Sequence, residues 1–171
     1  PMPAVSSNSQ LQIPANAPLP VETMEKNTLV IESLGITAPI IYPEEKSETE
    51  FQRSLQYGVV QYPGTALVGR PGNTYIFGHS SDYPWNKGEY KTIFALLPNI
   101  VEGAEIKVSD NTGKVFKYLV TKKFVAEKTN TELLTQDTSK YQLTLQTSYP
   151  IGTALKRYIV VAELIPRVYG N

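Results

Sequence analysis

The sequence predicts an all-β fold, a closed barrel or sandwich of about eight strands with little helix. The first indication is a series of short apolar runs of strand length, each bounded by Gly or Pro turn residues. The second is composition, because 11 Tyr and 13 Pro accompany only 19% charged residues. A chain of 171 residues is long enough for one domain with a proper core, and it contains no internal repeat.

The N-terminal segment 1–27 is expected to be a linker or N-terminal extension, because prolines alternate there with small polar residues. The folded domain is expected to span residues 28–171. Apolar runs within it predict strands at residues 29–31, 36–42, 58–60, 74–77, 105–108, 115–125, 143–147 and 158–164. The first two strands are joined by a turn at Gly35, and the fifth and sixth form a hairpin around Asp110 to Gly113.

One helix is predicted over Glu48–Leu55, where Phe51 and Leu55 lie four residues apart. Ser47 is a candidate N-cap, and Glu50 three residues later completes the pattern of a capping box. Two further segments carry weaker helical signals. Residues 91–97 are expected to form one or two helical turns before Pro98, and residues 126–140 a polar loop with a short helix at most.

Charge and composition exclude several classes of function. Sixteen basic residues balance sixteen acidic ones, which argues against nucleic acid or an anionic membrane surface as the main partner. The chain has no cysteine, so disulfides, iron–sulfur clusters and cysteine-rich zinc sites are excluded. A single histidine excludes a multi-histidine metal site. The acidic residues Glu44, Glu45, Glu48 and Glu50 match no calcium-binding loop, so no metal or cofactor is expected.

No stretch approaches the 18 apolar residues of a membrane span, and no signal peptide is visible. The chain begins at Pro1 rather than at an initiator Met. We therefore interpret it as a trimmed chain, and an anchor or signal before Pro1 is expected.

Chemistry is predicted at strand ends, where His79, Ser148 and Arg157 stand. The short segment 149–156, which contains Pro150, is predicted to be a turn between two antiparallel strands. Ser148 and Arg157 would then lie near one rim of the sheet, where loops commonly carry sites. His79 shares that rim if its strand runs parallel to the strand that ends at Ser148.

These segments resemble the sortase family. Residues 144–148, TLQTS, resemble the T-L-x-T-C signature of sortases, with Ser148 in place of the nucleophilic Cys. Residues 73–80, NTYIFGHS, are similar to the strand that ends in the sortase catalytic His. Residues 156–162, KRYIVVA, are similar to the strand that starts with the catalytic Arg, and the resemblance covers roughly residues 28–165.

The resemblance implies a closed eight-stranded sortase-like β-barrel with one or two short helices. It also implies a transpeptidase that cleaves a C-terminal LPxTG-like sorting signal and joins the new carboxyl to an amine of peptidoglycan or of a pilin lysine. By analogy the residue at 148 attacks the Thr–Gly carbonyl, His79 handles protons, and Arg157 hydrogen-bonds the substrate or the oxyanion. Thr147, Tyr149 and Trp85 are assigned to substrate binding. Such enzymes act at the extracytoplasmic face of the bacterial membrane, which they reach through an anchor.

The departure from the family lies at the nucleophile. A thiolate is populated beside a cationic imidazole, whereas a serine hydroxyl needs a strong, oriented base. The sequence shows no obvious acid partner for His79, so Ser148 is expected to be inefficient. Either a deliberate Cys-to-Ser change or a natural serine explains this residue.

Several alternatives stay open. Lys156 and Arg157 are adjacent and could exchange roles, although a guanidinium donates paired hydrogen bonds better. Tyr83, Pro84 and Trp85 either wall the substrate groove or pin a long loop onto the barrel. The runner-up function is a non-catalytic module, or inactive homologue, that binds a peptide by strand addition or groove docking.

Overall fold

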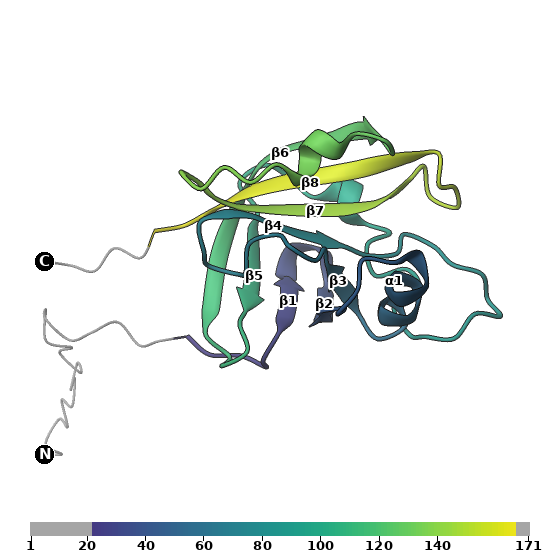
Figure 1. Ribbon diagram of the computed structural model, residues 1–171. Helices are drawn as coiled ribbons and strands as arrows, with labels where there is room; N and C mark the ends of the chain where they lie inside the picture. The colour runs from purple at the N-terminus through teal and green to yellow at the C-terminus, as the bar shows by residue number, and fades with distance from the viewer. Residues whose placement is uncertain (1–21, 167–171) are drawn as a thin grey trace, which may run out of the picture.

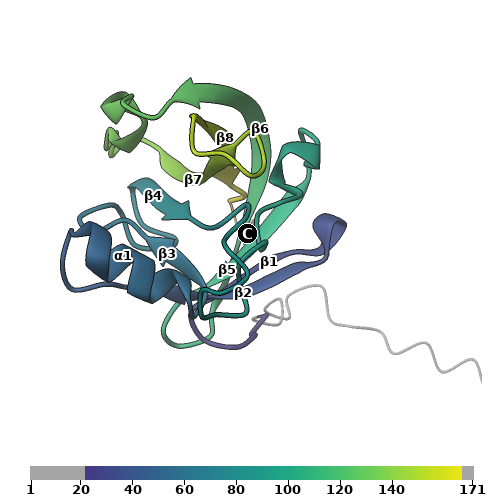
Figure 2. The same cartoon turned by 90° about the vertical axis from the view of Figure 1, so that its right-hand side faces the viewer.

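The computed structural model describes residues 22–166, which form a closed barrel of eight strands (Figures 1 and 2). Around the barrel the strands follow the order β1-β2-β3-β4-β7-β8-β6-β5. Their bounds are β1 Thr28–Ile31, β2 Ile36–Ile41, β3 Val59–Gln61, β4 Gly72–Phe77, β5 Glu105–Ser109, β6 Val115–Glu127, β7 Tyr141–Tyr149 and β8 Lys156–Leu164. The helices are η1 Glu32–Leu34, α1 Glu48–Leu55, η2 Leu97–Asn99 and η3 Thr131–Leu134. The predicted eight-stranded barrel with little helix is confirmed.

Strand direction decides which residues share a rim. Most neighbouring strands are antiparallel, but β2 pairs with β3 and β4 with β7 in parallel. Because β4 and β7 run the same way, the residues that follow them emerge at the same rim. β8 is antiparallel to β7 and therefore begins at that rim. The sequence analysis expected His79 to share a rim with Ser148 if their strands were parallel, and they are.

Local sequence signals account for the turns and the helix. Gly35 has a φ of 65° between β1 and β2, a conformation that glycine adopts without strain. The Ser47 hydroxyl accepts a hydrogen bond from the Glu50 amide at 3.2 Å and starts α1 as predicted. The serine half of the capping box therefore forms. The Glu50 carboxylate pairs instead with Arg53 at 3.2 Å.

The core fills the barrel interior. β2 alternates buried and exposed residues, whereas β4 and β8 carry consecutive buried residues because they are covered on both faces. The segment after β4 also contributes, since Phe94, Leu97 and Ile100 are almost completely buried in the main core cluster. A side chain at Gly78 would meet the Phe94 ring at 2.8 Å, so glycine allows Phe94 to pack beside the chain that leads into His79.

Several strand ends differ from the sequence predictions by one or two residues, and two differences have a clear physical reason. Residues 91–96 form irregular turns instead of a helix, and the 3-10 helix η2 begins at Leu97 with Pro98 in its first turn. Proline is tolerated there because the first turn of a helix leaves its amides unpaired. β6 continues to Glu127, beyond the predicted end, because it pairs along its length with β8.

The last residues of the predicted linker contact the barrel. Thr23 bridges to Lys114, and the Met24 amide donates to the Gly113 carbonyl at 3.0 Å. The remainder of the segment, residues 1–21, and residues 167–171 lie outside the described residues. The domain boundary at residue 28 stays a prediction. Within residues 22–166 no helix has the length and apolar character needed to cross a membrane.

Candidate active site

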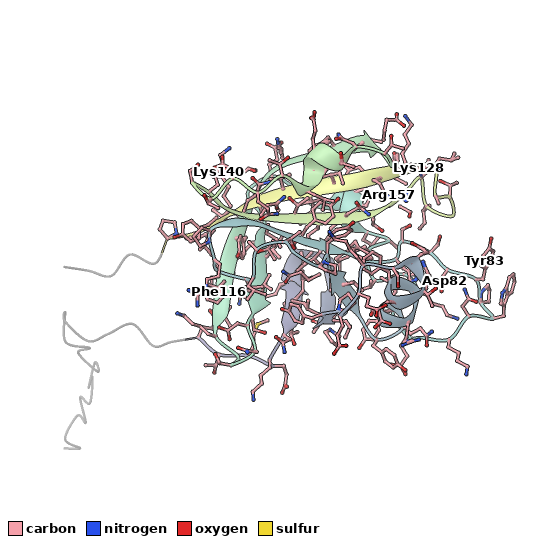
Figure 3. The ribbon with its side chains drawn as sticks, in the orientation of Figure 1. Asp82, Tyr83, Phe116, Lys128, Lys140 and Arg157 are labelled. Atoms are coloured by element: carbon pink, nitrogen blue, oxygen red, sulfur yellow. The ribbon has the colours of Figure 1, made fainter. Side chains whose placement is uncertain are left out.

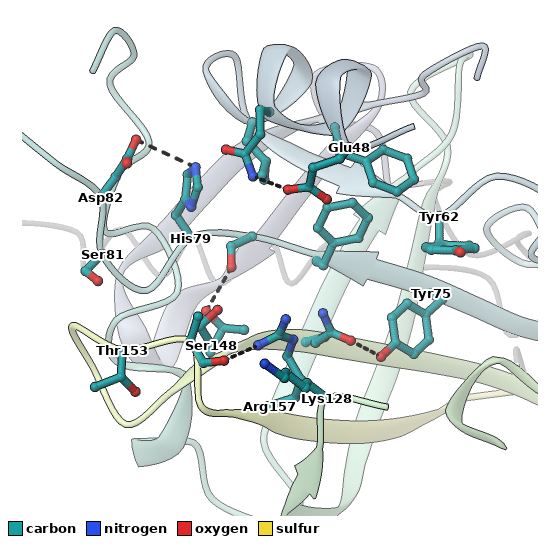
Figure 4. Close-up of a pocket in the computed structure, with 18 of the residues that line it drawn as sticks. Glu48, Tyr62, Tyr75, His79, Ser81, Asp82, Lys128, Ser148, Thr153 and Arg157 are labelled. Carbon is teal, nitrogen blue, oxygen red and sulfur yellow. Dashed lines mark hydrogen bonds and ion pairs between the residues drawn. The ribbon is translucent and has the colours of Figure 1, made fainter. Parts of the chain in front are cut away.

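A cleft of about 800 Å³ opens at the rim where β4 and β7 end and β8 begins (Figure 4). Its walls come from α1, from the chain after β4, from the β7–β8 turn and from the connection that follows β6. Its lining includes the charged side chains Glu48, Asp82, Lys128 and Arg157 and the His79 imidazole. Ser148 lines the same cleft, so all three residues predicted to be catalytic border one space.

His79 is positioned by backbone contacts on both sides. Its carbonyl accepts a hydrogen bond from the Phe94 amide at 2.9 Å, which ties the residue to the core. The preceding Gly78 donates its amide to the Gln146 carbonyl at 3.1 Å and accepts the buried Thr147 hydroxyl at 2.8 Å. The ends of β4 and β7 are thus joined one residue before His79 and one before Ser148.

The His79 imidazole lies in an environment that favours its neutral form. Its side chain is only 19% exposed, and this burial lowers its pKa, an effect that Asp82 opposes through its charge. Asp82 Oδ2 lies 3.8 Å from His79 Nε2, within ion-pair range and beyond a hydrogen bond. The sequence showed no obvious acid partner for His79, but the loop after β4 folds Asp82 back beside the ring and supplies one at ion-pair distance.

Ser148 and Arg157 are direct cross-strand partners in the β7–β8 register. The Arg157 guanidinium donates to the carbonyls of Ala154 and Lys156 at 3.3 and 3.2 Å, which holds it along the turn. Lys156 is exposed, and its ammonium pairs with Glu127 at 2.7 Å on the neighbouring strand. The structure thus places Arg157, and not Lys156, on the cleft.

The three residues predicted to bind substrate occupy different places. Thr147 is buried and lines the cleft, while its hydroxyl is engaged by Gly78. Tyr149 is not among the lining residues and packs against the Tyr158 ring at 5.3 Å. Trp85 is 77% exposed and lies outside the cleft lining. The Trp85 ring stacks on the Tyr83 ring, with 4.7 Å between the ring centroids, and Tyr83 lines the cleft. The aromatic segment therefore extends outward from the rim.

An aromatic wall faces the catalytic candidates. It consists of Phe51 from α1, Tyr62 after β3, and Tyr75 and Phe77 from β4, with Phe51 and Phe77 rings 5.1 Å apart. Burial raises the pKa of the Tyr75 phenol, and the charge of Arg157 opposes this rise by a smaller amount. The phenol donates a hydrogen bond to Gln146 Oε1. This wall offers apolar surface beside the polar rim, a combination typical of ligand-binding sites.

Sequence reasoning missed Asp82, Lys128 and the aromatic wall. Asp82 had a local signal, because it stands three residues after His79. Lys128 had none, since only the fold brings the chain after β6 to this rim (Figure 3). In the part of the chain that the structure describes, no group of three or more His, Cys, Asp or Glu residues is placed to hold a metal ion.

A closed mixed barrel with His79, Ser148 and Arg157 at one rim defines a class of protein, and comparison with known families names it. Residues 29–165 match the profile of the Sortase domain family, and the chain belongs to the sortase family. Sortases are cysteine transpeptidases, and this chain has no cysteine. It is therefore a sortase-family transpeptidase domain that lacks the family's nucleophile. The recognition made from the sequence motifs is confirmed.

Solved structures support the same assignment. The chain is similar to sortase C-1 from Actinomyces oris, with 28% identity and a TM-score of 0.69 over 81% of this chain and 72% of that one. It is similar to sortase C1 from Streptococcus suis, with 25% identity and a TM-score of 0.69 over 84% and 74%. It shares its fold with a sortase D5 transpeptidase from Clostridium perfringens, with 24% identity and a TM-score of 0.67 over 86% and 83%. A search among curated protein sequences gave no match.

Proposed function

We propose that this domain is built to cleave a C-terminal LPxTG-like sorting signal and to join the new carboxyl to an amine, and that Ser148 makes the present form inactive. The observation that carries the proposal is the shared cleft, in which position 148, His79 and Arg157 meet beside an aromatic wall. The apolar residues of such a peptide would pack on that wall. The scissile carbonyl would then lie at the polar rim.

With cysteine at position 148, each residue has a defined step. The thiolate attacks the Thr carbonyl carbon, and protonated His79 gives its proton to the departing Gly nitrogen as the C–N bond breaks. The product is a thioester. An incoming amine then attacks the thioester, gives a proton to His79 and displaces the thiolate. Arg157 donates hydrogen bonds to the carbonyl oxygen as negative charge develops on it.

Serine interrupts this sequence at its first step. A thiol with a reference pKa near 8.5 is converted to thiolate by cationic neighbours, whereas an alkyl hydroxyl stays protonated. His79 would have to remove the proton during attack. Asp82 lies beyond hydrogen-bond distance of the ring, so its support for that transfer is incomplete in the free protein.

The partners follow from the reaction. The donors are sorting-signal peptides of secreted surface proteins, and the acceptors are amines of peptidoglycan or of a pilin lysine. The place of action is the extracytoplasmic face of the bacterial membrane, with attachment through an anchor before the present chain. Nucleic acid has no part in it, in keeping with the balanced charge.

The decisive experiment converts Ser148→Cys and incubates the variant with a panel of LPxTG-like peptides, with and without an added amine. Mass spectrometry should detect a thioester adduct without amine and a ligated peptide with it. Ser33→Cys, on exposed η1 and outside the cleft lining, is the matched control for a thiol placed elsewhere. The control should form no adduct.

A second candidate is a non-catalytic peptide-binding module, favoured by one observation, the missing cysteine. Both candidates expect the Ser148 protein to bind a sorting peptide. They differ after Ser148→Cys, since only the transpeptidase reading expects acylation and transfer. Binding without any adduct across a broad peptide panel would establish the module and overturn the enzyme.

A further inference from the structure

The loop after β4 holds an acidic residue in a fixed position beside the candidate base. Asp82 Oδ1 accepts the Tyr83 amide at 2.8 Å and the Asn86 side-chain amide at 2.7 Å. Its other oxygen, Oδ2, faces His79 Nε2 at 3.8 Å. The two carboxylate oxygens therefore have separate tasks, one fixing the loop and one facing the imidazole.

The arrangement places the imidazole between a carboxylate and the nucleophile position. In Figure 4 the His79 ring lies between Asp82 and Ser148, with the dashed ion pair on the Asp82 side. A carboxylate beside Nε2 favours the tautomer that carries its proton there, because a donor then faces a negative oxygen. Nδ1 is then left as the acceptor. The Asp82 carboxylate is only 15% exposed, so solvent screens the interaction weakly.

We propose that Asp82 is the positioning residue for His79: it orients the imidazole toward position 148 and stabilises its protonated form during catalysis. The proposal rests on the proposed function in one respect, the proton-transfer role of His79. Asp82 itself need not touch substrate. A tightening of the 3.8 Å contact when substrate enters the cleft would convert the ion pair into a hydrogen bond as the ring gains a proton.

The other charges around the cleft do not supply this effect. Arg157 from β8 and Lys128 from the chain after β6 carry the same sign as an imidazolium, so neither can stabilise it. Glu48 from α1 is hydrogen-bonded by Gln52 at 2.9 Å. The remaining titratable groups of the lining are the phenols Tyr62, Tyr75 and Tyr83. Within the described residues, Asp82 is the carboxylate that pairs with His79.

The test uses the chain's single histidine, whose imidazole protons give one unambiguous NMR titration in the native Ser148 protein. Asp82→Asn is isosteric and keeps an oxygen for Tyr83 and Asn86, so it changes only the atom that faces His79. We expect Asp82→Asn to lower the pKa of His79 and Asp82→Glu to restore part of the loss. Asp137→Asn removes the same charge from an exposed turn outside the cleft and should leave the titration unchanged.

A kinetic readout in the Ser148→Cys background separates positioning from folding. Asp82→Asn should reduce kcat/KM about tenfold to a hundredfold and move the basic limb of its pH profile to lower pH, because protonated His79 is the proton donor. Its melting temperature should match that of Asp137→Asn. An unchanged His79 titration and an unchanged pH profile after Asp82→Asn would overturn the proposal. The titration needs no turnover, so it decides the role of Asp82 even if the proposed function fails.

Discussion

Charged side chains stand at both ends of the barrel, but they are paired differently. Figure 3 shows Arg157, Lys128 and Asp82 at one end, with Phe116 and Lys140 toward the other. At the far end, a cluster of charges around Glu22 has close partners. Glu22 accepts Lys107 at 3.1 Å and Lys117 at 2.9 Å.

The turn between β5 and β6 shows the same local pairing. Burial acts to raise the pKa of Asp110, but hydrogen bonds from Thr112 and from the Lys114 amide outweigh it and hold the pKa below its usual value. Around the cleft, by contrast, the His79 pair is long and Arg157 donates only to backbone carbonyls. Charges that already have short partners stabilise the fold, whereas charges left incompletely paired around a cleft are available to a ligand.

The largest expected effect is a loss of peptide cleavage when a charged residue of the cleft is removed. In the Ser148→Cys background, Arg157→Ala should lower peptide cleavage at least about 100-fold, because a donor to the developing oxyanion is lost. Lys156→Ala is the matched control, since Lys156 is adjacent but pairs with Glu127. It should stay within about twofold of its parent, in line with a surface pair. Equal losses in both variants, measured as kcat/KM, would remove Arg157 from the site.

The next largest effect is on the free energy of unfolding, when a buried hydroxyl and an exposed one are each removed. Thr147→Val keeps the side-chain shape but removes the hydrogen bond to the Gly78 carbonyl, which joins β4 to β7. We expect a loss of about 1–2 kcal/mol in unfolding free energy. Thr112→Val removes an exposed hydroxyl from Asp110 at the far end. It should cost less than about 0.5 kcal/mol in chemical denaturation, as is usual for surface substitutions.

The pH dependence of stability should also separate the two ends. His79 has a lowered pKa in the folded protein, chiefly from burial, so the unfolded chain binds its proton first as pH falls. Stability should therefore decline as pH drops through about 6.5, the ordinary histidine pKa. Thermal melts of His79→Asn should lack this decline.

At the far end, stability should also decline as pH falls, but in a lower pH range. Hydrogen bonds from Lys117 and then Lys107 lower the pKa of Glu22, so its contribution is present above its unfolded pKa and is lost as pH falls through the folded one. Glu22→Gln should flatten the acid loss below about pH 4.3 and leave the histidine window intact. A single shared transition in both variants would contradict this separation.

The sequence allowed the barrel, and the placement of the three candidate residues at strand ends, to be predicted because both depend on the pattern of apolar strands. Buried runs in β4, β7 and β8 were long enough to define strands, and their order placed His79, Ser148 and Arg157 at strand ends. The positions of residues in the loops could not be predicted from the sequence. Asp82 and Lys128 reach the cleft through irregular backbone, whose direction depends on tertiary contacts such as the Phe94 amide donating to His79.

The smallest expected effect concerns the N-terminal segment. Removing residues 1–20 should change the melting temperature by less than about 2 °C, because this proline-rich stretch has little apolar surface to offset its ordering entropy. The truncation keeps Glu22 with its two lysine partners and the Asn27 amide bond to the Asp110 carbonyl at 2.9 Å.

Extending the truncation to residue 27 removes those contacts, and the melting temperature should then fall by roughly 4 °C or more. Glu22→Gln in the shorter truncation isolates the ion pairs from the backbone bonds and should account for only part of that fall. Differential scanning calorimetry of the three proteins at one pH and salt concentration decides the outcome. A large drop from removing residues 1–20 alone would show that this segment packs as part of the fold, so that stabilising contacts at the far end extend beyond Glu22.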